Sequence, residues 1–199
     1  MTGTFAVVTG GGSAGHVLPA LAIAEALVDA GHEPGEVHYV GAARGLERTL
    51  LPETPFSFTL LDVVGLQREL NLANVRRNAA FMPRLTTASR AARRLLRQLQ
   101  PAVVVSVGGY ASVPAVLAAR RLKIPVVVVS YDRRPGRASA LQARIAVATA
   151  AAYADSPLPR AVVTGAPLRR RILSVDRARD RAAARDRLPV PLLRAAPDQ

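Results

Sequence analysis

FAVVTGGGSAGHVLPALAIAEALVDAGH, residues 5–32, is the stretch that decides the fold. Its first five residues are apolar and rich in β-branched side chains, which predicts a buried strand. A glycine-rich turn follows, and apolar residues then recur at helical spacing from Val17 until Gly31. A strand, a glycine turn and a helix place free backbone N–H groups at a helix N-terminus, where the helix dipole favours an anion. The stretch therefore predicts a phosphate or diphosphate ligand beside His16.

The same turn admits two other interpretations. Gly10, Gly12 and Gly15 fit the G-x-G-x-x-G pattern of dinucleotide-binding folds. That pattern requires an acidic residue about 20 positions on, at the end of the second strand, to bind a ribose hydroxyl. The second predicted strand, 37–40, runs instead into Gly-Ala-Ala-Arg, where Arg44 would have to face a 2′-phosphate, so an NADP-binding domain stays open. In the remaining interpretation the glycines only form a tight turn and the histidine caps the helix.

Beyond this unit, strands and helices alternate along the chain. Further strands are predicted at 56–64, from 101 and at 126–129. Helices are predicted at 45–51, at 74–100 with a candidate break at Pro83, at 110–121, within 138–152 before a short strand, and at 175–188. Such alternation is typical of a parallel sheet flanked on both faces. The sequence thus predicts an α/β fold, a Rossmann-like parallel sheet with helices on both faces.

The composition excludes several classes of protein. The formal net charge of +13 comes almost entirely from arginine, and aromatic residues make up only 4%, which argues against a nucleic-acid partner. An anionic membrane surface and an arginine-rich genome remain as explanations of the charge. The absence of cysteine excludes disulfides and thiolate metal sites. No segment reaches the roughly 18 consecutive apolar residues of a spanning helix, and the N-terminus lacks a signal-peptide pattern, so a cytosolic chain is expected.

A second glycine turn follows the predicted strand in PAVVVSVGG, residues 101–109. Paired glycines again let the backbone approach an anionic group at the start of a helix. Because the carboxyl ends of parallel strands meet at one edge of a sheet, the two turns are predicted to converge on one crevice. Tyr110, which comes next, either hydrogen-bonds the ligand or only packs.

Together the two turns resemble the glycine loops of family 28 glycosyltransferases. GGSAGHVLPALAIAEAL, residues 11–27, is similar to the first loop of that family, and GGYASVP, residues 108–114, to its second. The resemblance implies the N-terminal half of a GT-B fold, whose loops hold the diphosphate of a lipid-linked acceptor. It assigns the catalytic base to His16, whose proton affinity the helix N-terminus is expected to lower. The residues implied to bind the acceptor diphosphate are Gly11, Gly12, Ser13, Ala14, Gly15, Gly108, Gly109 and Tyr110.

The resemblance also implies a reaction. It is the inverting transfer of N-acetylglucosamine from UDP-N-acetylglucosamine to a polyprenyl-diphosphate-linked sugar, the lipid I to lipid II step of peptidoglycan synthesis. No metal or cofactor is implied, because helix dipoles and an arginine can neutralise the leaving diphosphate. Asp132 and Arg169 are implied to bind the donor. Asp132 departs from the asparagine of the family's His-Glu-Gln-Asn motif, and a carboxylate there would repel a UDP diphosphate or bind an acceptor hydroxyl instead.

The predicted helix at 74–100 carries apolar and basic residues side by side. An ordinary amphipathic helix with a solvated basic face explains this pattern as well as a special role does. The resemblance implies that the region docks on an anionic membrane, which would place the protein in the cytoplasm, peripheral on the inner face of the cell membrane. The implied membrane patch consists of Arg77, Phe81, Met82, Arg84 and Leu85.

The resemblance also sets the expected domain organisation. Residues 1–174 correspond to the N-terminal family domain, and 175–199 are expected to form a basic helix and a linker or tail. Family members hold most of the UDP-sugar site in a second Rossmann-like domain, and this sequence has no third glycine loop, so a donor-binding domain or subunit outside the chain is expected. The alternative hypothesis is a non-catalytic acceptor-binding or membrane-docking subunit of a split transferase. His32 and His38 are expected to have no catalytic role.

Overall fold

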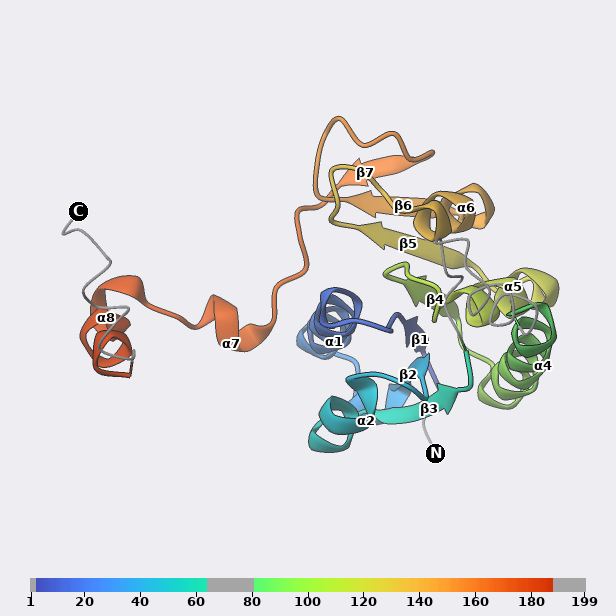
Figure 1. Ribbon diagram of the computed structural model, residues 1–199, viewed down its shortest axis with the longest axis horizontal. Coiled ribbons are helices and arrows are strands. Elements are labelled where there is room, and N and C mark those ends of the chain that lie inside the picture. Colours follow the sequence, from blue (N-terminus) through green and yellow to red (C-terminus); the bar gives the residue numbers. More distant parts are fainter. Residues whose placement is uncertain (1–2, 64–80, 188–199) are drawn as a thin grey trace, which may run out of the picture.

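A single parallel sheet of seven strands organises the protein (Figure 1). The computed structural model describes residues 3–63 and 81–187. The strand order is β3-β2-β1-β4-β5-β6-β7, and every pairing is parallel. The strands are β1 (Ala6–Thr9), β2 (Val37–Ala42), β3 (Ser57–Leu61), β4 (Val103–Ser106), β5 (Val126–Ser130), β6 (Ala148–Ala151) and β7 (Ala161–Val163). The predicted parallel α/β fold is confirmed, and its order is that of a doubly wound sheet.

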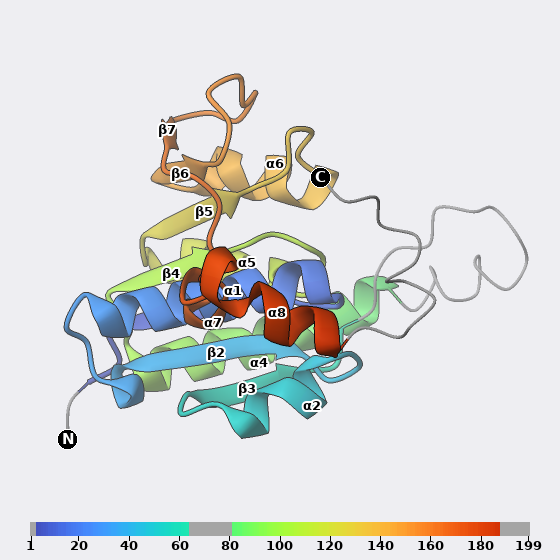
Figure 2. The same cartoon turned by 90° about the vertical axis from the view of Figure 1, so that its left-hand side faces the viewer.

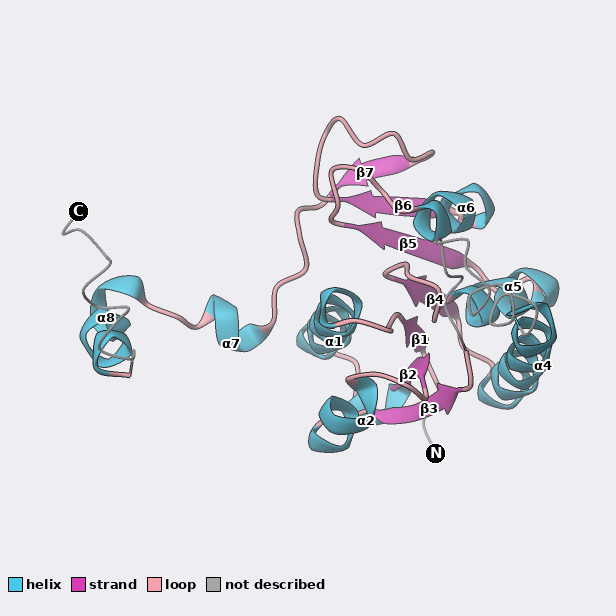
Figure 3. Cartoon of the chain, viewed as in Figure 1, coloured by secondary structure: helices cyan, strands magenta, loops and turns pink. Residues whose placement is uncertain are grey.

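Helices cover both faces of this sheet (Figure 3). One face carries α1 (Ala14–Asp29) and α2 (Glu47–Leu50), and the other carries α4 (Phe81–Leu99), α5 (Val113–Leu122) and α6 (Arg137–Ile145). Two 3-10 turns, η1 (Pro34–Glu36) and η2 (Leu51–Glu53), accompany the first face. After β7 come α7 (Arg170–Leu173) and α8 (Arg177–Asp186), and α8 lies apart from the sheet (Figures 1 and 2).

The core forms because the central strands are apolar on both sides. All four residues of β1 are fully buried, since helices cover the sheet above and below it. On one face Val8 packs with Leu21 of α1, and on the other Val104 packs with Leu96 and Val116. These two clusters anchor β1 and β4, and thereby fix the two loops that leave those strands.

Several boundaries differ from the predicted ones. Helix α1 begins at Ala14 rather than at Val17, because Ser13 is an extended N-cap and the polar first turn carries no apolar repeat. Helix α4 continues through Pro83 without a break, since its first turn needs no intrahelical N–H there; residues 74–80 of that prediction lie outside the described residues. The prediction did not include β7, a three-residue strand whose side chains are exposed.

The turns at the amino ends of the strands lie at the edge away from the glycine loops. Gly31, with a φ of 103°, follows α1 and leads toward β2. Lys123 caps α5 in the left-handed conformation, with a φ of 60°, and leads into β5. Because all strands run in the same direction, the sheet has a loop edge that carries both glycine turns and an opposite edge that carries these connections.

Candidate functional site

Two glycine loops touch each other at the carboxyl edge of the sheet. The first connects β1 to α1 and the second connects β4 to α5, and these strands are neighbours whose ends pair Thr9 with Ser106. A Cβ atom added at Gly109 would lie 3.1 Å from the carbonyl oxygen of Gly11 and 3.2 Å from Cδ2 of His16. Gly109 also has a φ of 78°, which favours glycine. The predicted convergence of the loops is therefore present.

His16 lies between the loops in the first turn of α1 and is half-buried. Its Nδ1 is 2.9 Å from the hydroxyl oxygen of Ser13. Burial lowers the pKa of His16, and the negative charge of Asp132 opposes that shift only in part. The pKa of His16 is lowered as expected, and burial is the largest cause of the shift. His16 is consequently neutral near pH 7.

Tyr110 packs its ring on the first loop. A Cβ at Gly12 would lie 2.5 Å from Cε1 of Tyr110, so only glycine fits beneath the ring. Burial raises the pKa of Tyr110, and the charge of Glu47 adds to the shift, so the phenol stays neutral. The contacts show that Tyr110 packs, and its hydrogen bond to a ligand stays a prediction.

Glu47 is a buried carboxylate that the sequence analysis did not single out. Its Oε1 accepts hydrogen bonds from the amides of Gly12 at 2.9 Å and Ala42 at 3.0 Å, and the side chain has no exposed surface. The amide of Gly12 therefore points inward, toward Glu47. A signal existed in the sequence, because Glu47 follows the second strand within GAARGLE, where two glycines leave space.

The buried side-chain amide of Gln142 holds the second glycine loop, and the sequence analysis did not single it out either. Gln142 of α6 is 1% exposed, and its Nε2 donates to the carbonyl of Gly109 at 3.3 Å. Its Oε1 accepts from the hydroxyls of Ser106 at 2.5 Å and Ser112 at 3.2 Å. The hydroxyl of Ser112 also donates to the carbonyl of Gly108 at 2.9 Å. A buried network of this kind fixes the loop, since each member would lose its partner if the loop moved.

Tyr131 links the end of β5 to the start of α1. Its hydroxyl donates to the carbonyl oxygen of Gly15. Within a helix that carbonyl would accept from residue 19, but Pro19 has no N–H, so Tyr131 supplies the missing donor. Burial raises the pKa of Tyr131 to about 12, with the charge of Asp132 adding to it. Asp132, the next residue, lies close enough to His16 for its charge to act on the imidazole.

Arg169 is held by α1. Its Nε donates to Oε1 of Glu25 at 2.8 Å, and one terminal nitrogen bonds the same oxygen at 2.5 Å. The backbone amide of Arg170 donates a hydrogen bond to Glu25 at 3.0 Å, and its side chain donates one to Asp29. Burial works against the ionised form of Glu25, yet the bonds and charges of both arginines outweigh it and lower its pKa. This cluster ties α7 to α1.

The dinucleotide interpretation finds little support at the loop edge. Arg44, its candidate for a 2′-phosphate, lies 3.5 Å from Asp62 in an exposed ion pair. The carboxylate nearest the end of β2, Glu47, already accepts two backbone amides and faces no solvent. Glu47 is therefore not available to bind a cofactor ribose.

The predicted membrane patch is only partly described. Met82 is 60% exposed on α4, while Arg84 and Leu85 are half-buried; the side chain of Phe81 and all of Arg77 lie outside what the structure describes. A cavity of about 450 Å³ lies between α4 and α5, lined by Met82, Leu85, Leu117, Arg90, Arg93 and Arg121, among others. Within residues 3–63 and 81–187, no helix combines the length and apolarity that crossing a bilayer requires.

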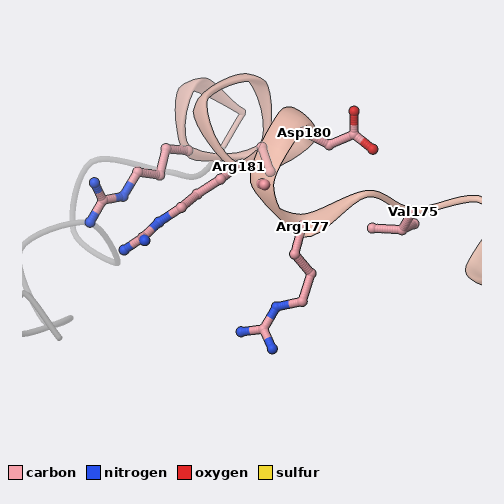
Figure 4. Close-up of a pocket in the computed structure, with 7 residues that line it drawn as sticks. Val175, Arg177, Asp180 and Arg181 are labelled. Atoms are coloured by element: carbon pink, nitrogen blue, oxygen red, sulfur yellow. The ribbon is translucent and has the colours of Figure 1, made fainter.

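A larger hollow, of about 600 Å³, lies beside α8 (Figure 4). The side chains of Arg177, Asp180 and Arg181 point in different directions there and do not converge on one point. The Nε of Arg179 donates a hydrogen bond to Oδ1 of Asp180 at 2.8 Å. Elsewhere in the described part of the chain, no three His, Asp or Glu side chains are grouped so that they could hold a metal ion. The candidate site is therefore the place where the two glycine loops meet around His16.

A doubly wound sheet with two glycine loops at its carboxyl edge is the architecture of α/β domains that bind nucleotides and phosphate esters. Comparison with known proteins narrows this class. The glycosyltransferase family 28 N-terminal domain matches residues 6–151, which is well over half of the chain. The chain belongs to this family.

Relatives and a solved structure agree with the family. The chain is 41% identical over 181 residues to the UDP-N-acetylglucosamine–N-acetylmuramyl-(pentapeptide) pyrophosphoryl-undecaprenol N-acetylglucosamine transferase of Corynebacterium jeikeium, covering 90% of this chain and 47% of that protein. It is 42% identical over 188 residues to the enzyme of the same name from Mycobacterium sp. strain KMS, covering 93% and 48%. The crystal structure of MurG from Acinetobacter baumannii superposes with a TM-score of 0.66 at 27% identity, covering 84% and 46%. The chain thus spans about half the length of the relatives it matches.

Proposed function

We propose that this chain is the acceptor-binding half of a MurG-type hexosyltransferase. In this proposal the transferase moves N-acetylglucosamine from UDP-N-acetylglucosamine to a polyprenyl-diphosphate-linked sugar, as the names of its relatives state for them. The observation that carries the proposal is the contact between Gly109, Gly11 and His16, which joins two anion-binding loops around one histidine. Residues 1–174 form the family domain in this proposal, and 175–199 a basic helix and linker toward a donor-binding domain or subunit.

The acceptor diphosphate binds across the two loops. Ala14 and Gly15 open α1, so no carbonyl within the helix can pair their amides, and the positive end of the helix dipole faces the same direction. Gly108 and Gly109, with φ values of 83° and 78°, let the backbone of the second loop approach the ligand. Gly11, Gly12, Ser13 and Tyr110 complete the implied binding set, with Gly12 acting through its lack of a side chain.

His16 is the proposed base. A tautomer that donates Nδ1–H to the hydroxyl of Ser13 leaves a lone pair on Nε2. That nitrogen takes the proton of the acceptor hydroxyl as its oxygen attacks the anomeric carbon of the donor sugar. The lowered pKa of His16 keeps it unprotonated and ready to act at neutral pH. No cofactor or metal takes part, because the leaving UDP diphosphate is stabilised by helix dipoles and arginine.

Asp132 and Arg169 face the donor side of the proposed site. Arg169 is bonded to Glu25, so it can bind the donor diphosphate only by exchanging that carboxylate for phosphate oxygens. Asp132 adds a negative charge next to the base, which weighs against direct contact with a diphosphate. These two features favour the second candidate, a non-catalytic acceptor-binding subunit of a split transferase.

The proposed place of action is the cytoplasmic face of the cell membrane. Met82, Leu85 and Arg84 belong to the implied patch with Arg77 and Phe81, and three further arginines line the adjacent cavity between α4 and α5. Apolar side chains beside arginines suit an interface with anionic lipid headgroups. No nucleic-acid partner is proposed.

Binding of a soluble lipid I analogue in detergent tests the proposal. Wild type is compared with His16→Ala, which removes the base but leaves both loops, and with NADP as a competing ligand. Saturable binding of the analogue that NADP does not displace is expected. Displacement by NADP, or no binding of the analogue, contradicts the proposed function.

Turnover separates the two candidates. UDP-N-acetylglucosamine and the analogue are mixed with this chain, alone and together with the donor-side half of a MurG relative. Product that forms only with the donor half and vanishes in His16→Ala supports a catalytic acceptor half. Full binding without turnover in either mixture supports the non-catalytic subunit.

A further inference from the structure

A fully buried carboxylate lies directly beneath the proposed diphosphate site. Glu47 contacts the first loop from the side away from solvent, and its Oε1 accepts the amide of Gly12, 35 positions earlier in the chain. The same oxygen accepts the amide of Ala42, the last residue of β2. One atom thereby joins the inner turn of the loop to the end of a core strand.

Glycines create the space for this carboxylate. A Cβ at Gly11 would lie 2.0 Å from Oε1 of Glu47, and one at Gly45 would lie 2.4 Å from Oε2. At Gly41 an added Cβ would lie 3.0 Å from Cγ of the same side chain. Any larger residue at these positions would displace the carboxylate, so its place is built by the first glycine loop and by the segment that follows β2.

The charge of Glu47 has no evident structural benefit. Its Oε2 is buried and has no hydrogen-bond partner among the described residues. Burying a carboxylate is unfavourable unless hydrogen bonds compensate, and a negative charge behind an anion site repels the anion. What the side chain supplies is an acceptor of the right length for two buried amides, which would otherwise be unpaired.

We propose that Glu47 is the positioning residue of the first glycine loop, which turns the amide of Gly12 inward so that the amides that follow it face the acceptor diphosphate. This inference rests on the proposed function and deepens it. Glu47 does not touch the ligand. It acts by holding the loop, and for this role the length of its side chain matters more than its charge.

Two substitutions separate reach from charge. Glu47→Asp keeps the charge but withdraws the carboxylate by one methylene, whereas Glu47→Gln removes the charge but keeps an oxygen acceptor of the same length. Glu53→Gln, at an exposed site in η2, is the control for the loss of one negative charge. Binding of a lipid I analogue and amide hydrogen exchange of the ligand-free chain are measured for each variant.

We expect Glu47→Asp to bind the analogue at least about tenfold more weakly, the equivalent of one lost hydrogen bond. In that variant the amides of Gly12 and Ala42 should exchange faster, while that of Tyr39 in β2 stays protected. Glu47→Gln should bind at least as tightly as Glu53→Gln, with both amides protected. A merely structural carboxylate would not produce this split between two conservative variants.

Opposite results overturn the inference. Equal binding by both Glu47 variants, a larger loss in Glu47→Gln, or unchanged protection of Gly12 and Ala42 in Glu47→Asp each contradicts it. If wild type does not bind the analogue, the proposed function fails, yet the exchange rates still decide whether Glu47 holds the loop.

Discussion

Replacing Gly109 by alanine tests the contact between the two glycine loops. The new Cβ would lie 3.1 Å from the carbonyl oxygen of Gly11 and 3.2 Å from the ring of His16. Both neighbours are held in place, one by a loop backbone and the other by a helix. The methyl group can be accommodated only if the loops separate by a few tenths of an ångström.

The free energy cost of Gly109→Ala has two parts, and substitutions at two other glycines measure these parts separately. A left-handed residue costs an alanine about 1–2 kcal/mol, and crowding in a packed site typically adds about 1–3 kcal/mol. Gly165 has a φ of 83° and nothing within 4 Å of an added Cβ, so Gly165→Ala carries the first part alone. Gly35 has open space and no positive φ, so Gly35→Ala carries neither.

Urea unfolding and lipid I analogue binding measure these variants. We expect the free energy of unfolding to fall by about 2–5 kcal/mol for Gly109→Ala, by about 1–2 kcal/mol for Gly165→Ala, and to change little for Gly35→Ala. Only Gly109→Ala should weaken binding, by at least about tenfold, since separated loops no longer present their amides together. If Gly109→Ala binds like Gly165→Ala, the contact between the loops does not form the binding site.

Three further predictions concern the surroundings of the site. Glu25→Ala should speed tryptic cleavage after Arg169, measured by mass spectrometry, because α7 loses its attachment to α1; unchanged cleavage would show that other contacts hold it. Tyr131→Phe should lower the free energy of unfolding by about 1 kcal/mol, since the carbonyl of Gly15 loses its donor, and an unchanged urea midpoint would contradict this. Burial lowers the pKa of His38. The contribution of this histidine to the free energy of unfolding is therefore complete above about pH 6.5, its ordinary pKa, and is lost as the pH falls toward the lowered value. His38→Gln should flatten that part of the plot of urea midpoint against pH, and a profile like that of the wild type would refute this prediction.

The sheet was predictable because its strands are continuous apolar runs. Most of the valines of β4 and β5 are buried, and such apolar runs are typical of a parallel sheet covered by helices on both faces. The exposed strand β7 was not predicted, since Val162 and Val163 are 60% and 57% exposed and nothing in their pattern marks a core strand. Its pairing with β6 comes from backbone hydrogen bonds that the sequence does not reveal.

The site was predictable where neighbouring residues form it. Glycines next to a strand and a helix marked both loops, and the histidine was marked by its place in the first of them. Glu47 and Gln142 were missed because their partners lie 35 and 33 positions away, at Gly12 and Gly109. A long-range hydrogen bond from a side chain to a backbone leaves no periodic pattern, so only the folded chain reveals it.

The position of Lys123 has a practical consequence. It is the single lysine of the sequence, since arginine supplies the other basic side chains. It is exposed on the turn that leads into β5, at the edge of the sheet away from the glycine loops. Amine-reactive dyes and coupled sensor surfaces therefore attach only there and at the α-amino group. The chain can be labelled or immobilised in a known orientation, with the glycine loops and His16 at the opposite edge of the sheet left free.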